Sequence, residues 1–157
     1  MRGRFALGAM ALAGMLVLGS AAQAFVGTVD RITDADTFYV GGTEIRLDGV
    51  DAPDPDQICL RGGQKYKCGE EAKAGLLAIV AGRPVTCVKV GEDVFKRAVV
   101  RCDVGGKDLG AELVRAGWAV AFVKFSKRYV AQEAEARKAK RGLWEGSFDR
   151  PRVWRRK

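Results

Sequence analysis

The chain has 157 residues, with 27 lysines and arginines, 19 aspartates and glutamates and no histidine, and its formal net charge is +8. Without an imidazole group, serine–histidine and cysteine–histidine catalysis and every histidine-ligated zinc or nuclease centre are excluded. Any catalysis therefore rests on carboxylates, arginines, lysines and a hard cation, and the basic charge favours polyanionic partners.

The first segment has the pattern of a secretory signal peptide. Two arginines precede an apolar run over residues 5–18, and small residues close it at positions 22–24. The run is shorter than the about 20 residues that a membrane span needs, and its flanks are typical of a signal cleaved before Phe25. We therefore expect residues 1–24 to be removed and the mature protein to be secreted or periplasmic, with no membrane segment.

Short strands rich in β-branched and aromatic residues are expected next, over residues 25–32, 36–42 and 43–50. The pair Gly41-Gly42 predicts a tight turn between the second and third of them. Downstream, helical spacing of apolar residues alternates with strand-like segments. The later elements expected are a helix over residues 68–82, strands over 83–90 and 97–104, a short helix over 109–117, an extended apolar run over 118–125 and a helix over 126–142.

Three strands, a helix, two strands and C-terminal helices predict a small five-stranded β-barrel of the OB type. The chain after signal removal is long enough for one domain with one core. We place this domain at residues 25–145 and a basic C-terminal tail at residues 146–157. The tail carries five cationic side chains beside Trp154, and it is interpreted either as an arm that contacts phosphates or as a solvated end.

Four cysteines in an exported chain favour disulfides over a metal site, and no C-x-x-C pair is present. Four cysteines allow three pairings. Proximity along the chain favours Cys59 with Cys68 and Cys87 with Cys102. The second bond would cross a hairpin whose turn centres on residues 93–95.

Two groups of aspartates lie where neighbouring strands are expected to end. Asp36 begins the second strand and Asp51 follows the third, so antiparallel pairing would bring the two carboxylates together. Oxygen ligands of this kind, with the carbonyl of Ala52, suit Ca²⁺ or Mg²⁺. The alternative is that the aspartates only cap turns, because Asp accepts hydrogen bonds from nearby backbone amides.

Five stretches, DADT, IRLDGVDAPD, DVFKRAVVRC, LVRAGWAVAF and EARKAKRGLW, resemble in order and spacing the thermonuclease (staphylococcal-nuclease-like) family. The resemblance covers about residues 25–144. It implies an OB fold and the hydrolysis of DNA and RNA phosphodiesters with Ca²⁺. It also implies that Asp36 and Asp51, with the carbonyl of Ala52, bind that cation.

The same resemblance implies that Arg46 and Arg97 are the catalytic arginines and that Asp54 is the general base. These roles agree with the chemistry. Charge grows on the equatorial oxygens of a phosphodiester during in-line displacement, and guanidinium groups can stabilise it with paired hydrogen bonds. A carboxylate within reach of the attacking water can accept its proton.

The chain departs from the family pattern at several site positions. Asp54 stands where the family has glutamate, so its carboxylate reaches about 1.5 Å less far, which predicts a slower enzyme unless the loop moves inward or Asp56 substitutes. Lys96 replaces a turn glycine, which requires a different turn or a positive φ at lysine. Phenylalanines stand at tyrosine positions, and with Lys96 they are the expected substrate-binding residues: Phe95, Phe122 and Phe125.

Three classes of function remain open from the sequence. The first is a secreted monomeric Ca²⁺-dependent nuclease that acts on single-stranded DNA or RNA. The second is a non-catalytic OB module that stacks bases on these phenylalanines or on Tyr129. The third is a disulfide-linked envelope protein whose basic tail contacts anionic polymers. The first class predicts cleavage that stops when a chelator is added. The second predicts salt-sensitive binding without cleavage, and the third predicts neither cleavage nor binding of useful affinity.

Overall fold

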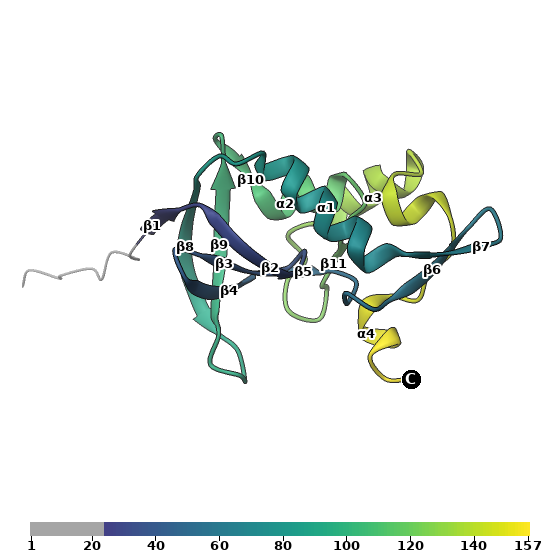
Figure 1. Cartoon of the computed structure of the whole chain (residues 1–157), viewed down its shortest axis with the longest axis horizontal. Helices are drawn as coiled ribbons and strands as arrows, with labels where there is room; N and C mark the ends of the chain where they lie inside the picture. The colour runs from purple at the N-terminus through teal and green to yellow at the C-terminus, as the bar shows by residue number, and fades with distance from the viewer. Residues whose placement is uncertain (1–23) are drawn as a thin grey trace, which may run out of the picture.

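The computed structural model describes residues 24–157 (Figure 1). The predicted signal peptide, residues 1–24, lies outside the described residues except for Ala24. Among the residues from 24 onward, no helix has both the length and the apolar character needed to cross a membrane.

A curled sheet with strand order β1-β8-β9-β4-β3-β2 forms the centre of the molecule. Neighbouring strands are antiparallel except β4 and β9, which are parallel. The two ends of this path, β1 and β2, are separated only by Thr28, so the sheet starts and finishes on one stretch of chain. The strands are β1 (Ala24–Gly27), β2 (Val29–Asp34), β3 (Thr37–Val40), β4 (Thr43–Leu47), β8 (Val85–Glu92) and β9 (Ala98–Val104), with β10 (Lys107–Asp108) beside β9.

This strand order is that of an OB-like fold and confirms the fold class expected from the sequence. The single strand expected over residues 25–32 is wrong, because the chain bends at Thr28 and changes partner. β1 pairs with β8, whereas β2 pairs with β3. The bend brings Gly27 against Val40, where a Cβ atom would lie 2.8 Å from Val40 Cγ1. Only glycine fits this close approach without a shift of its neighbour.

The longer helices lie together on one side of the sheet in Figure 1. The expected helix over residues 126–142 forms only over nine residues, because the preceding segment folds into turns closed by Phe122 O, which accepts from the amides of Phe125 and Ser126. The expected extended run over residues 118–125 is reduced to a two-residue strand for the same reason. The elements are α1 (Cys68–Val80), α2 (Leu109–Arg115), β11 (Val120–Ala121), which pairs with β5 (Val50–Asp51), α3 (Val130–Lys138), the 3₁₀ helix η1 (Gly142–Glu145) and α4 (Pro151–Trp154).

A hairpin of β6 (Ile58–Arg61) and β7 (Gln64–Lys67) projects from the body of the molecule (Figure 1). Sequence reasoning assigned no element here. The signal was present, since Gly62-Gly63 lies between two strand-like segments and both glycines have positive φ.

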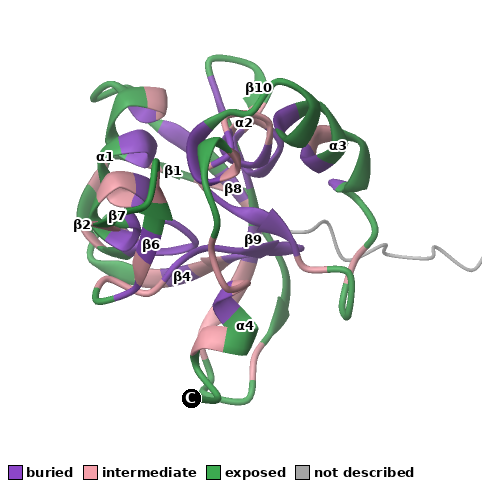
Figure 2. Cartoon of the chain, turned by 90° about the vertical axis from the view of Figure 1, so that its right-hand side faces the viewer, coloured by how far each residue is buried: buried purple, intermediate pink, exposed green. Residues whose placement is uncertain are grey.

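Buried residues concentrate on the inner face of the sheet and on the helix faces turned toward it (Figure 2). Phe38 and Ile45 from the sheet meet Leu76 of α1 and Leu113 of α2 in one cluster. A second, smaller cluster joins Leu143 to the cysteines at the base of the hairpin. The C-terminal segment is therefore packed against the fold through this second cluster.

Both predicted disulfides are confirmed. Cys87 and Cys102 lie directly opposite each other in the β8–β9 pair. Cys59 of β6 is bonded to Cys68, the first residue of α1. One bond therefore links two central strands, and the other closes the projecting hairpin.

Replacing Cys87 and Cys102 together with alanine should lower the free energy of unfolding by about 3 kcal/mol, because the bond restricts the unfolded chain. Urea unfolding followed by tryptophan fluorescence measures this difference. The matched control is the double alanine variant of Cys59 and Cys68. The disulfide that it removes lies outside the central sheet and joins residues 9 positions apart in the chain, against 15 for Cys87 and Cys102. A larger loss in that control would contradict the expectation that the bond closing the longer segment stabilises the protein more.

Candidate functional site

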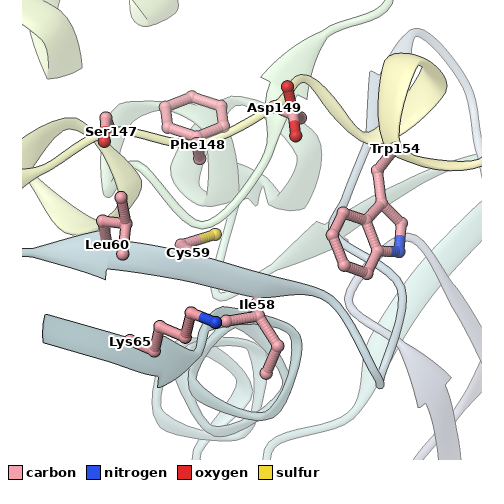
Figure 3. A pocket seen from close by; sticks show the side chains of 8 residues that line it. All are labelled: Ile58, Cys59, Leu60, Lys65, Ser147, Phe148, Asp149 and Trp154. Atoms are coloured by element: carbon pink, nitrogen blue, oxygen red, sulfur yellow. The ribbon is translucent and has the colours of Figure 1, made fainter. Parts of the chain in front are cut away.

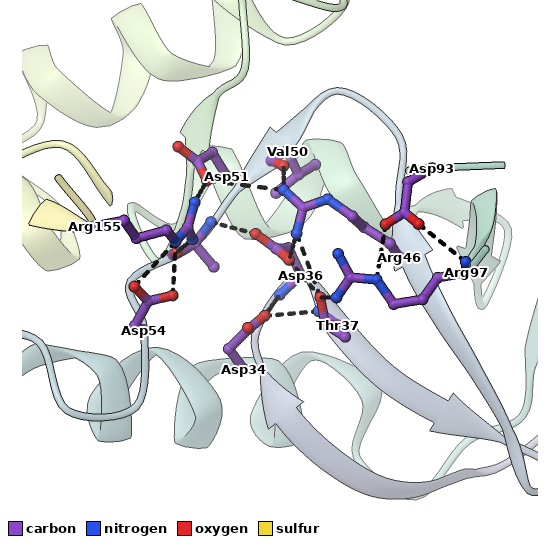
Figure 4. A network of polar contacts seen from close by, with 11 residues as sticks. Asp34, Asp36, Thr37, Arg46, Val50, Asp51, Asp54, Asp93, Arg97 and Arg155 are labelled. Atoms are coloured by element: carbon purple, nitrogen blue, oxygen red, sulfur yellow. Dashed lines mark hydrogen bonds and ion pairs between the residues drawn. The ribbon is translucent and has the colours of Figure 1, made fainter. Parts of the chain in front are cut away.

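Loops at one end of the curled sheet enclose a hollow of about 430 Å³. The β2–β3 turn, the outer end of β4, the segment after β5, the β8–β9 loop and the C-terminal segment meet there (Figure 4). Six of the predicted site residues line this hollow: Arg46, Asp54, Phe95, Arg97, Phe122 and Phe125. The predicted cation ligands lie next to this lining: Asp36 and Asp51 contact Arg46, and the carbonyl of Ala52 accepts from Arg155, which also lines the hollow.

Asp36 is fully buried and holds three parts of the site together. Its Oδ2 accepts from the amide of Ala52 at 2.7 Å, and its Oδ1 accepts from the Thr37 hydroxyl at 2.8 Å and from Nη1 of Arg46. The turn itself is capped by Asp34, whose Oδ1 accepts from the amides of Asp36 and Thr37. Turn capping therefore applies to Asp34, whereas Asp36 points into the site.

Two further carboxyl groups of this site hold their protons more strongly than a free aspartate does. Burial first, and then the neighbouring Asp36, raise the pKa of Asp34 to about 8. Burial also raises the pKa of Asp51, an effect opposed by Arg155 and Arg46 and reinforced by Asp36. Positive charge placed beside these carboxyl groups therefore favours their ionised forms.

Arg46 reaches across the site from β4. Its Nη2 lies 3.8 Å from Asp51 Oδ1 and 3.5 Å from the carbonyl oxygen of Val50, while Nη1 bonds Asp36. Its side chain is 15 % exposed, so it faces the hollow only at its edge. The fixed guanidinium is oriented by the two predicted cation ligands.

Arg97 is positioned by the β8–β9 loop. Asp93 accepts from the Arg97 side-chain Nε at 2.8 Å and from the Phe95 and Arg97 amides. Burial alone would raise the pKa of Asp93, but these donors lower it below its ordinary value. Lys96 in the same loop has a φ of 66°, so the positive φ expected as one of two alternatives is the one observed. Its exposed ammonium forms an ion pair with Glu92 and does not line the hollow, although Lys96 was expected to bind substrate.

The aromatic residues expected to bind substrate form one rim of the hollow. Phe95 and Phe125 are 76 % and 69 % exposed, and Phe122 packs edge-to-face against Phe125 with ring centroids 4.8 Å apart. Exposed rings beside guanidinium groups suit the stacking of unpaired bases. Tyr129 does not belong to this rim, because it is buried and its hydroxyl donates to Asp108.

Arg155 is a site residue that sequence reasoning did not find. Its Nη1 donates to Asp51 Oδ1 at 2.8 Å, its Nη2 to the carbonyl of Ala52 at 3.1 Å, and its Nε to both oxygens of Asp54 at 2.9 and 3.0 Å. Burial disfavours its charged form, but Asp51 and Asp54 raise the pKa of Arg155 overall. The interpretation of the tail as a solvated end is therefore wrong for Arg155, whereas its role as a phosphate-contacting arm stays a prediction. No local signal distinguishes it from the other arginines of the tail.

Other aspartates near the site have separate partners. Asp56, the alternative base, is exposed and lines a different hollow with Lys67 and Glu70. Asp48 forms an ion pair with Arg101 at 2.8 Å. Asp54 is thus the carboxylate of its loop that faces the hollow.

The oxygen donors of this site fit a hard cation. In residues 24–157, no three His, Cys, Asp or Glu side chains converge as a metal cluster, so a cation would rely on the carboxylates of Asp36 and Asp51 and the carbonyl of Ala52. All three oxygen groups already accept from a guanidinium cation: Asp51 and the Ala52 carbonyl from Arg155, and Asp36 from Arg46. These contacts show that the position stabilises positive charge, and oxygen ligands favour Ca²⁺ or Mg²⁺ over softer metals.

Comparison with known proteins places the chain in one family. A family model described as "Staphylococcal nuclease homologue" matches residues 44–146. The chain is 34 % identical over 128 residues to a protein of Rhizobium meliloti named succinoglycan biosynthesis protein ExoI, covering 79 % of this chain and 66 % of that protein.

Two eukaryotic relatives carry nuclease names. The rice protein called probable staphylococcal-like nuclease CAN4 is 34 % identical over 116 residues, which are 72 % of this chain and 22 % of that protein. The protein of Clavispora lusitaniae called probable endonuclease LCL3 is 33 % identical over 112 residues, 64 % of this chain and 47 % of that protein. The chain thus spans between about a fifth and two thirds of the length of these three relatives.

Proposed function

Because the chain belongs to the staphylococcal nuclease family, we propose that it is a Ca²⁺-dependent nuclease that hydrolyses phosphodiester bonds of single-stranded DNA or RNA. We further propose that it acts as a secreted or periplasmic monomer. The observation that carries the proposal is that Arg46, Arg97 and Asp54 line one hollow, beside buried acids and exposed aromatic rings.

The two arginines have complementary roles in this proposal. Arg46 is held by Asp36 and lies 3.8 Å from Asp51, so it meets a phosphate oxygen at a fixed position near the acidic cluster. Arg97 is held through Nε by Asp93, and among the described residues its Nη2 has no hydrogen-bond partner. Its outer edge is therefore available to a second phosphate oxygen, and pre-positioned donors of this kind stabilise the charge that develops in the transition state.

Asp36, Asp51 and the carbonyl of Ala52 would hold the cation. When bound, Ca²⁺ would neutralise the phosphate and polarise its oxygens. Asp54 would orient the attacking water and accept its proton, because it is the carboxylate of its loop that faces the hollow. Phe95 and Phe125 would stack the flanking bases, which favours unpaired strands over a duplex.

A second candidate function is nucleic-acid binding without cleavage. One observation favours it: the same arginine, Arg155, occupies the proposed base and two of the proposed cation ligands. If that contact were permanent, the basic hollow and aromatic rim would still bind single strands, but no water would be activated.

Incubation of the purified protein with heat-denatured DNA separates the two candidates. We expect cleavage with millimolar Ca²⁺ and none after chelation with EGTA, while the Arg46→Ala variant, purified in parallel, controls for contaminating nucleases. Salt-sensitive binding without cleavage at any Ca²⁺ concentration would contradict the nuclease proposal and support the binding module.

A further inference from the structure

We propose that the site is a guanidinium-binding site whose resident ligand is Arg155 of the same chain, and that Ca²⁺ binds only by displacing this side chain. This inference rests on the proposed function, since it concerns the proposed cation site. It assigns the C-terminal segment to control of the site.

The contacts of Arg155 coincide with the groups that the nuclease needs. Its three nitrogens reach Asp51, the Ala52 carbonyl and Asp54 at 2.8 to 3.1 Å, each with a different donor (Figure 4). The planar guanidinium can serve three acceptors at once, whereas a lysine ammonium would act as a point charge. Arg155 thus takes up two proposed cation ligands and the proposed base together.

The segment that carries Arg155 is anchored independently of the site. Pro151, the first residue of α4, is buried, and Arg150 forms an ion pair with Glu133 of α3. The buried Gln57 donates from Nε2 to the carbonyl of Asp149 at 2.7 Å.

Trp154 of α4 lines a hollow of about 570 Å³ together with residues of the β6–β7 hairpin, so α4 lies beside this hairpin (Figure 3). Arg155 directly follows α4 in the chain, so the docked helix holds its guanidinium at high effective concentration beside the acids.

Displacement needs only a side-chain movement. The Arg155 side chain is 34 % exposed, so it can rotate into solvent while α4 stays docked. Ca²⁺ and the guanidinium cannot both contact the Asp51 carboxylate and the Ala52 carbonyl without strong repulsion between like charges. A substrate phosphate offers the displaced guanidinium a new bidentate partner. Competition for the same oxygens therefore lowers the affinity of the resting protein for Ca²⁺.

Calorimetric titration of Ca²⁺ into the full protein and into Arg155→Ala tests the inference without reference to activity. We expect Arg155→Ala to bind Ca²⁺ about tenfold more tightly than the unmodified protein, and Arg155→Lys to lie between them. The matched control is Arg156→Ala, which removes the same charge from the adjacent residue. Within residues 24–157, the Arg156 side chain makes no ion pair, so its removal should leave the affinity for Ca²⁺ unchanged.

Thermal unfolding gives a second readout on the same proteins. Without Ca²⁺, Arg155→Ala should unfold at a lower temperature, because Asp51 loses its closest cation, and Ca²⁺ should raise its Tm more than that of the unmodified protein. Equal Ca²⁺ affinities in both proteins would overturn the competition and leave the nuclease proposal intact. Weaker binding by Arg155→Ala would overturn it as well. Cleavage of DNA with no Ca²⁺ binding by either protein would overturn both the competition and the assigned cofactor.

Discussion

Replacing Asp51 with asparagine should lower kcat/KM on heat-denatured DNA by about a thousandfold, which corresponds to about 4 kcal/mol of lost transition-state stabilisation. The substitution removes a buried carboxylate that lies 2.8 Å from Arg155 and 3.8 Å from Arg46. The amide oxygen of asparagine can still accept from Arg155. Cleavage rates across a Ca²⁺ series measure the loss.

The same variant should keep or raise its free energy of unfolding. Burial raises the pKa of Asp51, so its ionised form is less favourable in the folded protein than in the unfolded chain at neutral pH. A neutral asparagine removes that penalty. Asp48→Asn is the matched control, because Asp48 lies three residues earlier and pairs with Arg101 outside the hollow. Unchanged cleavage by Asp51→Asn would refute its assignment as a cation ligand.

A second large effect is expected at Asp54. Asp54→Ala should lower kcat by about 10²- to 10⁴-fold, the range typical of a lost general base, while Ca²⁺ binding survives. Asp54→Glu should raise kcat by up to about a hundredfold, because its carboxylate reaches about 1.5 Å further into the hollow. The gain should appear in kcat more than in KM, since water activation matters in the transition state.

Asp56→Ala is the control for this series, because Asp56 lines a different hollow and its replacement should leave kcat unchanged. Equal rates for aspartate, glutamate and alanine at position 54 would show that the base lies elsewhere. Asp54 also accepts from Arg155 through both oxygens. The series should therefore be repeated with Arg155→Ala, so that the loss of a base is not confused with the release of that arginine.

Local patterns in the sequence determined much of this protein. Alternating β-branched residues, the Gly41-Gly42 turn and the helical spacing after Cys68 are properties of neighbouring residues, and the structure confirms β3, β4, α1, β8, β9 and both disulfides. The sequence also predicted that Asp36 and Asp51 lie close together, and in the structure both contact Arg46, because adjacent strands bring their ends together. These features follow from interactions between residues close in the chain or on paired strands.

Tertiary packing decided the rest. The bend at Thr28 depends on two different partner strands, and the shortened α3 depends on turns that close on Phe122. The largest difference concerns Arg155, which meets Asp51 and Asp54 across more than a hundred residues of chain. The sequence shows five similar cationic residues in the tail, and only the docking of α4 brings Arg155 to the acidic site. A contact of this kind depends on the position of a whole helix, which no local pattern encodes.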